Sequence, residues 1–411
     1  MKLRPYQKDL SFKAASILSE LKIVYLAVEV RCGKTIISLE TAKLYGAKNV
    51  LFLTKKKAIS SIEKDYKAMK YNFNLTVINN ESLHKIKGKF DLLISDEHHR
   101  NGAFPKPNVM TKDIEERFCT LPMIFLSGTP HPENYSQIYH QFWCSRNSPF
   151  KEENFYRWAK NFVNIKDRRL GYAIVKDYSG GIKERIYPLI RPYMVTFSQK
   201  DAGFETEVIE NVLKVKMDDL TYFLARKLKK DLVIVSNAGD EIIADTAVKL
   251  MQKLHQIYSG TVLFEDKTNR IFDLSKAKFI KQYFKGKKIA IFYKFKAEFE
   301  ALKQVFGYDL TDNLDIFNET NKHIALQIIS GREGISLKEA DYLVYYNIDF
   351  SATSYWQSRD RMTTMQRKTN EVFWIFSENG IEEKIYEKVK LKKNYTSSIF
   401  KRDYDIPTAN Y

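Results

Sequence analysis

The sequence predicts an α/β protein with two lobes, each built on a parallel β-sheet, and a mostly helical segment between them. Short runs of consecutive apolar residues alternate with helical patterns from residue 24 to about residue 130, and again from about residue 274. These runs are continuous rather than alternating in polarity, which indicates strands buried on both faces. The residues between the two blocks are aromatic, basic and helical in pattern. We therefore expect a first lobe at 1–145, an insertion at 146–270, a second lobe at 271–395 and a basic tail at 396–411.

Each expected strand is a short apolar run next to a turn or a helical pattern. In the first lobe a helix is expected at 35–45, and strands are expected at 24–28, 50–53, 75–78, 90–94 and 123–126. In the second lobe, strands are expected at 288–292, 324–329, 342–346 and 372–376.

Composition narrows the class of protein. The chain has 411 residues, of which 44% are hydrophobic, and this suits a globular protein of two or three domains. Lys and Arg number 67 against 50 acidic residues, a net charge of +17, so the surface is either a solvated basic one or one that binds a polyanion. Cys32, Cys119 and Cys144 form no C-x-x-C pair, and no apolar leader or membrane-spanning run is seen, so we expect a cytoplasmic protein with free thiols and no membrane contact.

A phosphate-binding loop is predicted at residues 28–35, between a strand and a helix. Gly33 lets the backbone close on a phosphate, and the helix N-terminus offers free N–H groups and a positive dipole. Lys34 is expected to reach the β- and γ-phosphates, and Thr35 to bind Mg²⁺. Val28 stands where such loops have their first glycine.

Polar residues follow two further strands of the first lobe. Asp96 and Glu97 are expected to hold magnesium and to polarise the attacking water, with a solvated acidic turn as the alternative. His98 and His99 are expected to form hydrogen bonds rather than to bind a metal, because no ligand set of suitable spacing accompanies them. In the 127–130 segment, the hydroxyls are expected either to sense the γ-phosphate or to belong to an ordinary turn.

Taken together, these stretches resemble the superfamily 2 helicases, specifically the SNF2-like branch of DNA-stimulated ATPases. The resemblance covers about residues 3–390 and implies two RecA-like lobes, an SNF2-type helical insertion, and ATP with Mg²⁺ as cofactors. It makes residues 3–7 the adenine-side motif, with Gln7 reading the base, and adds Arg31, Ser127, Thr129 and Gly334 to the ATP site. It also implies contact with nucleic acid at motif Ia and motif V, through Thr54, Lys55, Lys56, Lys57, Ser330, Gly331 and Arg332.

Motif VI departs from the family pattern. Gln357, Asp360 and Arg361 match the frame Q-x-x-D-R, and Gln357 and Arg361 are expected at the ATP site. The second family arginine, which usually supplies the arginine finger, falls on Thr364. Arg359 and Arg367 are nearby candidates for that role. Either a neighbour substitutes for it, or hydrolysis is weak.

The function implied is an ATP-dependent motor that couples hydrolysis to movement on DNA, single- or double-stranded, without reading its sequence. The alternative is a nucleotide-gated clamp, or a duplex-remodelling or annealing ATPase with weak turnover and no strand separation. The compact chain resembles the versions carried by phages and mobile elements, so we expect a monomer that works with replication or recombination proteins such as a single-strand-binding protein. Residues 154–158 and 166–169 mix aromatic and basic side chains, which suits either nucleic-acid contact or core packing.

Overall fold

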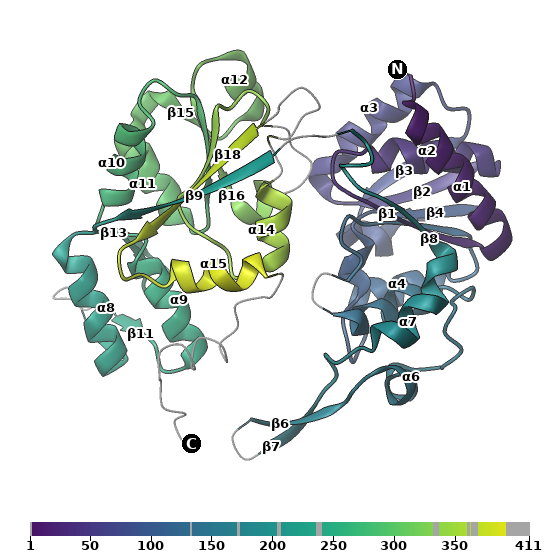
Figure 1. The fold of residues 1–411 in the computed structure, drawn as a ribbon, viewed down its shortest axis with the longest axis horizontal. Helices are drawn as coiled ribbons and strands as arrows, with labels where there is room; N and C mark the ends of the chain where they lie inside the picture. The colour runs from purple at the N-terminus through teal and green to yellow at the C-terminus, as the bar shows by residue number, and fades with distance from the viewer. Residues whose placement is uncertain are drawn as a thin grey trace. The chain divides into compact units, whose positions relative to one another are not determined.

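The computed structural model describes residues 2–131, 134–170, 173–203, 207–235, 241–331, 337–359, 362 and 369–391. It forms two compact units, Met1–Phe204 and Glu205–Tyr411. Each unit contains a six-stranded parallel sheet with helices on both faces (Figure 1). The predicted α/β fold with two parallel-sheet lobes is confirmed. Among the residues that the structure describes, no helix has the length and apolar character needed to cross a membrane.

The sheet of the first unit has the order β3-β2-β4-β5-β1-β8, and all its neighbouring strands are parallel. Its strands are β1 (Ile23–Val28), β2 (Asn49–Thr54), β3 (Asn74–Asn79), β4 (Leu92–Ser95), β5 (Met123–Leu126) and β8 (Met194–Phe197). Its helices are α1 (Pro5–Leu21), α2 (Lys34–Tyr45), α3 (Ile59–Met69), α4 (Val109–Phe118), α5 (Ile138–Trp143), α6 (Phe155–Phe162) and α7 (Lys183–Ile190).

Strand β1 shows why the first lobe has continuous apolar runs. Successive side chains of a strand point to opposite faces of the sheet. Val24 and Leu26 pack on the face covered by α1, α2 and α3, whereas Ile23 and Tyr25 pack on the face covered by α4 to α7. Both faces are buried, so every position of the strand has to be apolar.

The sheet of the second unit has the order β15-β16-β14-β17-β18-β9 and is also parallel throughout. Its strands are β9 (Glu207–Val215), β14 (Ile289–Tyr293), β15 (Leu310–Thr311), β16 (His323–Gln327), β17 (Tyr342–Tyr345) and β18 (Thr369–Ser377). Its helices are α8 (Asp219–Asp231), α9 (Ala247–Ile257), α10 (Ser275–Tyr283), α11 (Lys296–Phe306), α12 (Leu314–Glu319), α13 (Ile328–Gly331), α14 (Ala352–Arg359) and α15 (Glu382–Lys390).

The segment expected as a separate insertion, 146–270, is divided between the two units. It adds β8 to the first sheet and β9 to the second. It also contains three two-stranded antiparallel ribbons: β6 (Lys166–Leu170) with β7 (Ala173–Asp177), β10 (Val233–Val235) with β11 (Glu241–Ile243), and β12 (Thr261–Leu263) with β13 (Asn269–Ile271). Strand β9 mixes charged and apolar residues because it lies at a sheet edge, so it lacks the continuous apolar run of a central strand. The tail 396–411 lies outside the described residues.

Two of the three aromatic residues of the 154–158 segment, Phe155 and Trp158, belong to the core of the first unit, whereas Tyr156 is 45% exposed. Phe155 is 2% exposed and Trp158 is fully buried, and both lie in the cluster that covers one face of the sheet. Arg157 pairs with Glu153 on the surface. Packing therefore accounts for these two rings.

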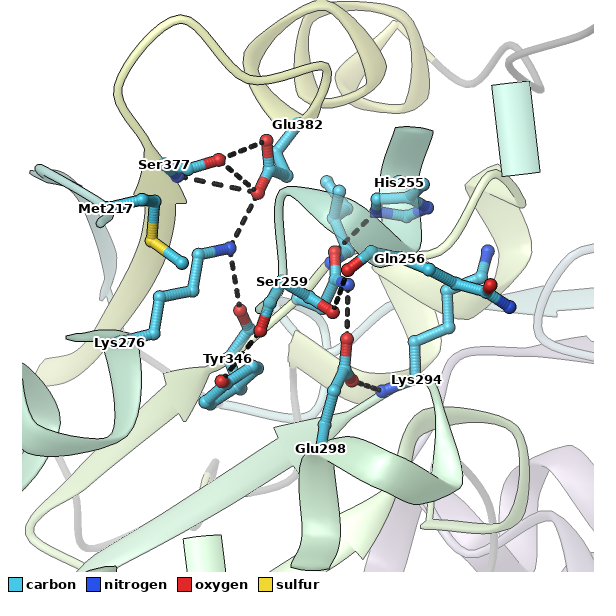
Figure 2. A network of polar contacts seen from close by, with 12 residues as sticks. Met217, His255, Gln256, Ser259, Lys276, Lys294, Glu298, Tyr346, Ser377 and Glu382 are labelled. Atoms are coloured by element: carbon cyan, nitrogen blue, oxygen red, sulfur yellow. Dashed lines mark hydrogen bonds and ion pairs between the residues drawn. The ribbon is translucent and has the colours of Figure 1, made fainter. Parts of the chain in front are cut away.

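A network of buried polar side chains connects helices and strand ends of the second unit (Figure 2). Lys276 of α10 and Glu382 of α15 form an ion pair of 2.6 Å, and neither side chain is exposed. Ser377, at the end of β18, donates its hydroxyl to the same carboxylate at 2.9 Å. Lys276 also donates to the main-chain oxygen of Tyr346 at 3.4 Å. The pair thus fixes α10 and α15 against the carboxyl ends of β17 and β18.

The second half of this network lies beside the carboxyl end of β14 (Figure 2). The carboxylate of Glu298 accepts hydrogen bonds from the backbone N–H groups of Lys294 and Phe295, at 2.7 and 2.9 Å. Asn347 donates its amide to Glu298 at 2.5 Å and bonds through its oxygen to the imidazole of His255. Helix α9 is thereby tied to the loops that follow β14 and β17.

Candidate nucleotide-binding site

The loop that the sequence predicts to bind phosphate lies between β1 and α2. Gly33 has a φ of +83°, in the left-handed region that favours glycine. A Cβ at this position would lie 2.3 Å from Nε2 of Gln7. The Gln7 amide is held in turn, because its oxygen accepts a hydrogen bond from the backbone N–H of Arg4 at 3.0 Å. The predicted base-reading residue therefore lies directly on the predicted phosphate loop.

Lys34 begins helix α2, and its side chain turns back over the loop. Its Nζ donates to the carbonyl of Val28 at 3.0 Å. A Cβ built on Gly128, in the segment after β5, would lie 3.6 Å from the same Nζ. Thr35 follows in the first turn of the helix, where backbone N–H groups lack intrahelical partners. The loop thus presents a cation and free N–H groups together, which suits an anionic phosphate.

Asp96 lies at the carboxyl end of β4, next to the phosphate loop. Burial and the neighbouring charge of Glu97 raise its pKa to about 6, while a hydrogen bond from Thr54 and the charge of Lys34 act in the opposite direction. The Thr54 hydroxyl donates to Asp96 Oδ2 at 2.9 Å, and the Glu97 N–H donates to Oδ1 at 3.0 Å. The family resemblance implies that Thr54 touches nucleic acid, but its side chain is buried against this carboxylate.

Glu97 is linked by His99 to the segment after β5. Glu97 has a φ of 48°, an unusual left-handed conformation for a residue with a side chain. Nδ1 of His99 lies 3.3 Å from Glu97 Oε2 and 2.9 Å from the Ser127 hydroxyl. Ser127 Oγ also accepts the backbone N–H of Thr129 at 3.0 Å. The two polar segments predicted separately thus form one hydrogen-bonded unit, a link that strand patterns do not reveal.

His98 points away from these hydrogen-bonded residues, into the core of the first lobe. Its ring stacks on Phe125 with centroids 3.6 Å apart, and its Nε2 donates to the carbonyl of Gln141 at 2.8 Å. Nδ1 accepts from the side-chain amide of Asn101 at 3.0 Å, so the ring is neutral. Burial lowers its pKa to about 3. Across the described part of the chain no group of three or more His, Cys, Asp or Glu residues could hold a metal ion.

The residues present fit a magnesium-bound triphosphate. Asp96 and the Thr35 hydroxyl are oxygen donors of the kind that Mg²⁺ prefers, and Lys34 supplies the cation for the phosphates. Thr129 Oγ1 is buried and has no hydrogen-bond partner among the described residues. Buried hydroxyls are normally bonded, so this one is suited to an acceptor that a ligand brings.

The structure describes some of the remaining predicted site residues and not others. Lys56 and Lys57 are exposed in a short 3-10 helix directly after β2, and Lys55 is half-buried beside them. Gln357 lies in α14, and Ser330 and Gly331 end α13. Outside the described residues lie Arg332, Gly334, Asp360, Arg361, Thr364 and Arg367.

A loop of this kind beside an Asp–Glu pair at the carboxyl edge of a parallel sheet is typical of the nucleotide-binding lobe of P-loop NTPases. No family model matches the chain. Two curated proteins of Saccharomyces cerevisiae are similar to it. Helicase SWR1 is 26% identical over 301 residues, covering 65% of this chain and 18% of SWR1. The ISWI chromatin-remodeling complex ATPase ISW1 is 21% identical over 366 residues, covering 80% of this chain and 31% of ISW1.

Two solved structures from Sulfolobus solfataricus are also similar. They are a SWI2/SNF2 ATPase core in complex with dsDNA (15% identity, TM-score 0.43, covering 99% of this chain and 96% of that chain) and a SWI2/SNF2 ATPase core domain (14%, 0.41, 95% and 89%). The chain spans less than a third of the length of either curated relative. The predicted resemblance to the SNF2-like branch of superfamily 2 is confirmed by these curated relatives.

Proposed function

We propose that this chain is an ATP-dependent nucleic-acid motor that hydrolyses ATP and uses the cycle to move on DNA. One observation carries the proposal: four side chains come together at one edge of the first sheet, those of Gln7, Lys34, Asp96 and Glu97. Two curated proteins that are similar to the chain are named as a helicase and as a chromatin-remodeling complex ATPase.

The side chains of the first lobe divide the chemistry between them. ATP supplies, when bound with Mg²⁺, the phosphoanhydride bond that water cleaves. Lys34 binds the phosphates, and Asp96 with Thr35 holds the metal ion. Glu97 orients the attacking water and accepts its proton on the carboxylate, which His99 keeps in place.

The arginine of motif VI is proposed to take part in hydrolysis. Arg361 is the arginine of motif VI that keeps its family position, and we assign it the stabilisation of charge on the γ-phosphate.

Contact with DNA is proposed through phosphates rather than bases. The net charge of +17 favours a polyanion, and Lys56 and Lys57 are exposed just beyond the carboxyl end of β2. Residues 330–332 of motif V are proposed as a second set of DNA contacts. Contacts of this kind are independent of sequence and weaken steeply as salt is raised.

The test is steady-state ATP turnover by the whole chain alone, with single-stranded DNA, with duplex DNA and with RNA, at low and moderate salt. We expect DNA to raise turnover at least about tenfold, and the Lys34→Ala variant to lose it. Lys303→Ala, which removes an exposed ion pair with Glu300 in the second unit, is the matched control and should behave as the wild type. Turnover that no nucleic acid stimulates would overturn the motor, and DNA binding gated by ATP without turnover would favour a clamp.

A further inference from the structure

The predicted phosphate loop is bound to the segment that follows strand β8. The two are neighbours because β1 and β8 pair in parallel and end together, with Val28 opposite Phe197. The backbone N–H of Glu29 donates to the carbonyl of Phe197 at 2.9 Å, and the carboxylate of Glu29 accepts the backbone N–H of Gln199 at 2.8 Å. Gln199 donates its side-chain amide to the carbonyl of Val30 at 3.0 Å. Gln199 therefore contacts the loop with both its backbone and its side chain.

Gln199 is itself held in place by a turn. The backbone N–H and the hydroxyl of Ser198 both donate to the carboxylate of Asp201, at 3.0 and 2.6 Å. The backbone N–H of Asp201 donates in return to the Ser198 hydroxyl at 3.1 Å. Side-chain bonds of this kind to nearby backbone groups fix a turn. The amide of Gln199 thus approaches the phosphate loop from a backbone that is already fixed.

The bond from Gln199 fixes the orientation of one peptide group of the loop. In a trans peptide, the C=O and the N–H of the next residue point in opposite directions. Because the carbonyl of Val30 faces Gln199, the N–H of Arg31 faces the other side of the loop. Arg31 has a φ of 65°, a left-handed conformation that is unfavourable for a residue with a side chain and persists where its surroundings impose it. Rotation of φ at Arg31 turns this same peptide group, so the bond from Gln199 also holds the angle.

A second carbonyl of the loop is held in the same way two residues later. The Tyr6 hydroxyl donates to the carbonyl of Cys32 at 3.4 Å, and the next residue, Gly33, again has a left-handed φ of 83°. The ring of Tyr6 stacks on Phe197 with centroids 4.8 Å apart, so both donors come from the side of β8. Turns that gather backbone N–H groups in this manner form the concave anion sites of phosphate loops.

We propose that Gln199 is a positioning residue for phosphate binding: it holds the carbonyl of Val30 and so keeps the N–H of Arg31 on the side of the loop that the phosphates occupy. This inference rests on the proposed function, since it concerns the same ATP site. A carbonyl turned toward the phosphates would repel them and would remove one N–H donor, so release of this peptide group weakens phosphate binding. A residue that only packs would affect stability and leave the affinity for phosphates unchanged.

The experiment compares Gln199→Met and Gln199→Asn with the wild-type chain. Methionine keeps the length of the side chain but cannot donate, and asparagine keeps the amide on a shorter side chain. Gln282→Met is the matched control, because Gln282 is exposed in α10 of the second unit. A bound fluorescent ATP analogue is displaced with inorganic tripolyphosphate, which probes the phosphate side alone, and with adenosine, which probes the base side. The kcat and KM for ATP with saturating DNA, and the thermal unfolding, are measured on the same preparations.

We expect both Gln199 variants to bind tripolyphosphate about three- to tenfold more weakly than the wild type, which is the effect of one lost neutral hydrogen bond. Their affinity for adenosine should stay within about twofold of the wild type, because the base side of the site is unchanged. The KM for ATP should rise and kcat should stay within about twofold, because the bond acts on binding rather than on the reaction of bound ATP. Gln282→Met should match the wild type in every measurement.

Two results would overturn the inference: a folded Gln199→Met variant that binds tripolyphosphate as the wild type does, or one whose affinities for tripolyphosphate and adenosine fall equally. If Gln199→Met is unfolded, Gln199→Asn is judged by the same two criteria. The failure of the proposed function has a different signature, because the wild-type chain then binds tripolyphosphate but shows no turnover that DNA stimulates. In that case the displacement by tripolyphosphate still decides the role of Gln199.

Discussion

Replacing Thr54 with Val exchanges the hydroxyl that donates to Asp96 for a methyl group of similar size. The rest of the side chain is unchanged. The hydrogen bond is 2.9 Å long and lies in a buried setting, where Asp96 has a pKa of about 6. A hydrogen bond to a charged group contributes about 1.5–3 kcal/mol. One pH unit corresponds to about 1.4 kcal/mol, so the loss should raise the pKa of Asp96 by about one to two pH units. At pH 7 the carboxylate then changes from about one-tenth protonated to half or more.

A protonated Asp96 cannot bind Mg²⁺, so activity should fall as the pH drops through its pKa. The assay is the pH dependence of kcat/KM for ATP with saturating DNA, which reports ionisations of the free enzyme. The acid limb of Thr54→Val should move up by about one to two pH units. Thr54→Ser keeps the hydroxyl and should follow the wild-type curve. A folded Thr54→Val protein with an unshifted acid limb would refute the assignment of this hydroxyl to Asp96.

Three further predictions concern single features of the two units. Gly33→Ala should weaken binding of a fluorescent ATP analogue at least about tenfold, because the added Cβ meets Gln7. Gly46 has the same φ of +83° but open space where a Cβ would lie, so Gly46→Ala should bind the analogue normally. Equal affinities of the two variants would contradict the close approach at the loop. Because the pKa of His98 is lowered to about 3, its contribution to stability is complete above about pH 6.5 and decreases below it, by about 2 kcal/mol at pH 5; urea unfolding across this range should show a shallower pH slope in His98→Gln. Lys276→Met should lower the free energy of unfolding, measured in urea, by about 3–5 kcal/mol, because it leaves the charge of Glu382 buried without its partner. Adding Glu382→Leu should restore most of this free energy, and a double variant no more stable than Lys276→Met would contradict a buried charge pair.

The sequence predicted the elements whose pattern follows from burial on both faces. The continuous apolar runs of β1, β2 and β5 leave little choice of structure, and the polar residues after β1, β4 and β5 meet because parallel strands end at one edge. For the same reason the pattern of strands and polar ends is enough to predict that Lys34 and Asp96 share one site.

Other features depend on contacts that are remote in sequence. Glu210 looks like an ordinary charged residue of an edge strand, and only the fold brings Arg359 to it across about 150 positions. The direction of Thr54 is likewise undetermined by sequence, because a hydroxyl at a strand end suits either a ligand or a neighbouring carboxylate. A pattern records which faces are buried, but it does not record which polar groups meet.

The assignment of Glu97 as the residue that orients water tests the account most directly. Glu97→Gln keeps the shape of the side chain and its place beside His99 but removes the charge. Binding of a fluorescent ATP analogue and steady-state ATP turnover with duplex DNA are measured on the same preparation. We predict that the variant binds the analogue within about twofold of the wild type and loses at least about a hundredfold in turnover. Turnover at the wild-type rate would contradict the account and place the hydrolytic site elsewhere.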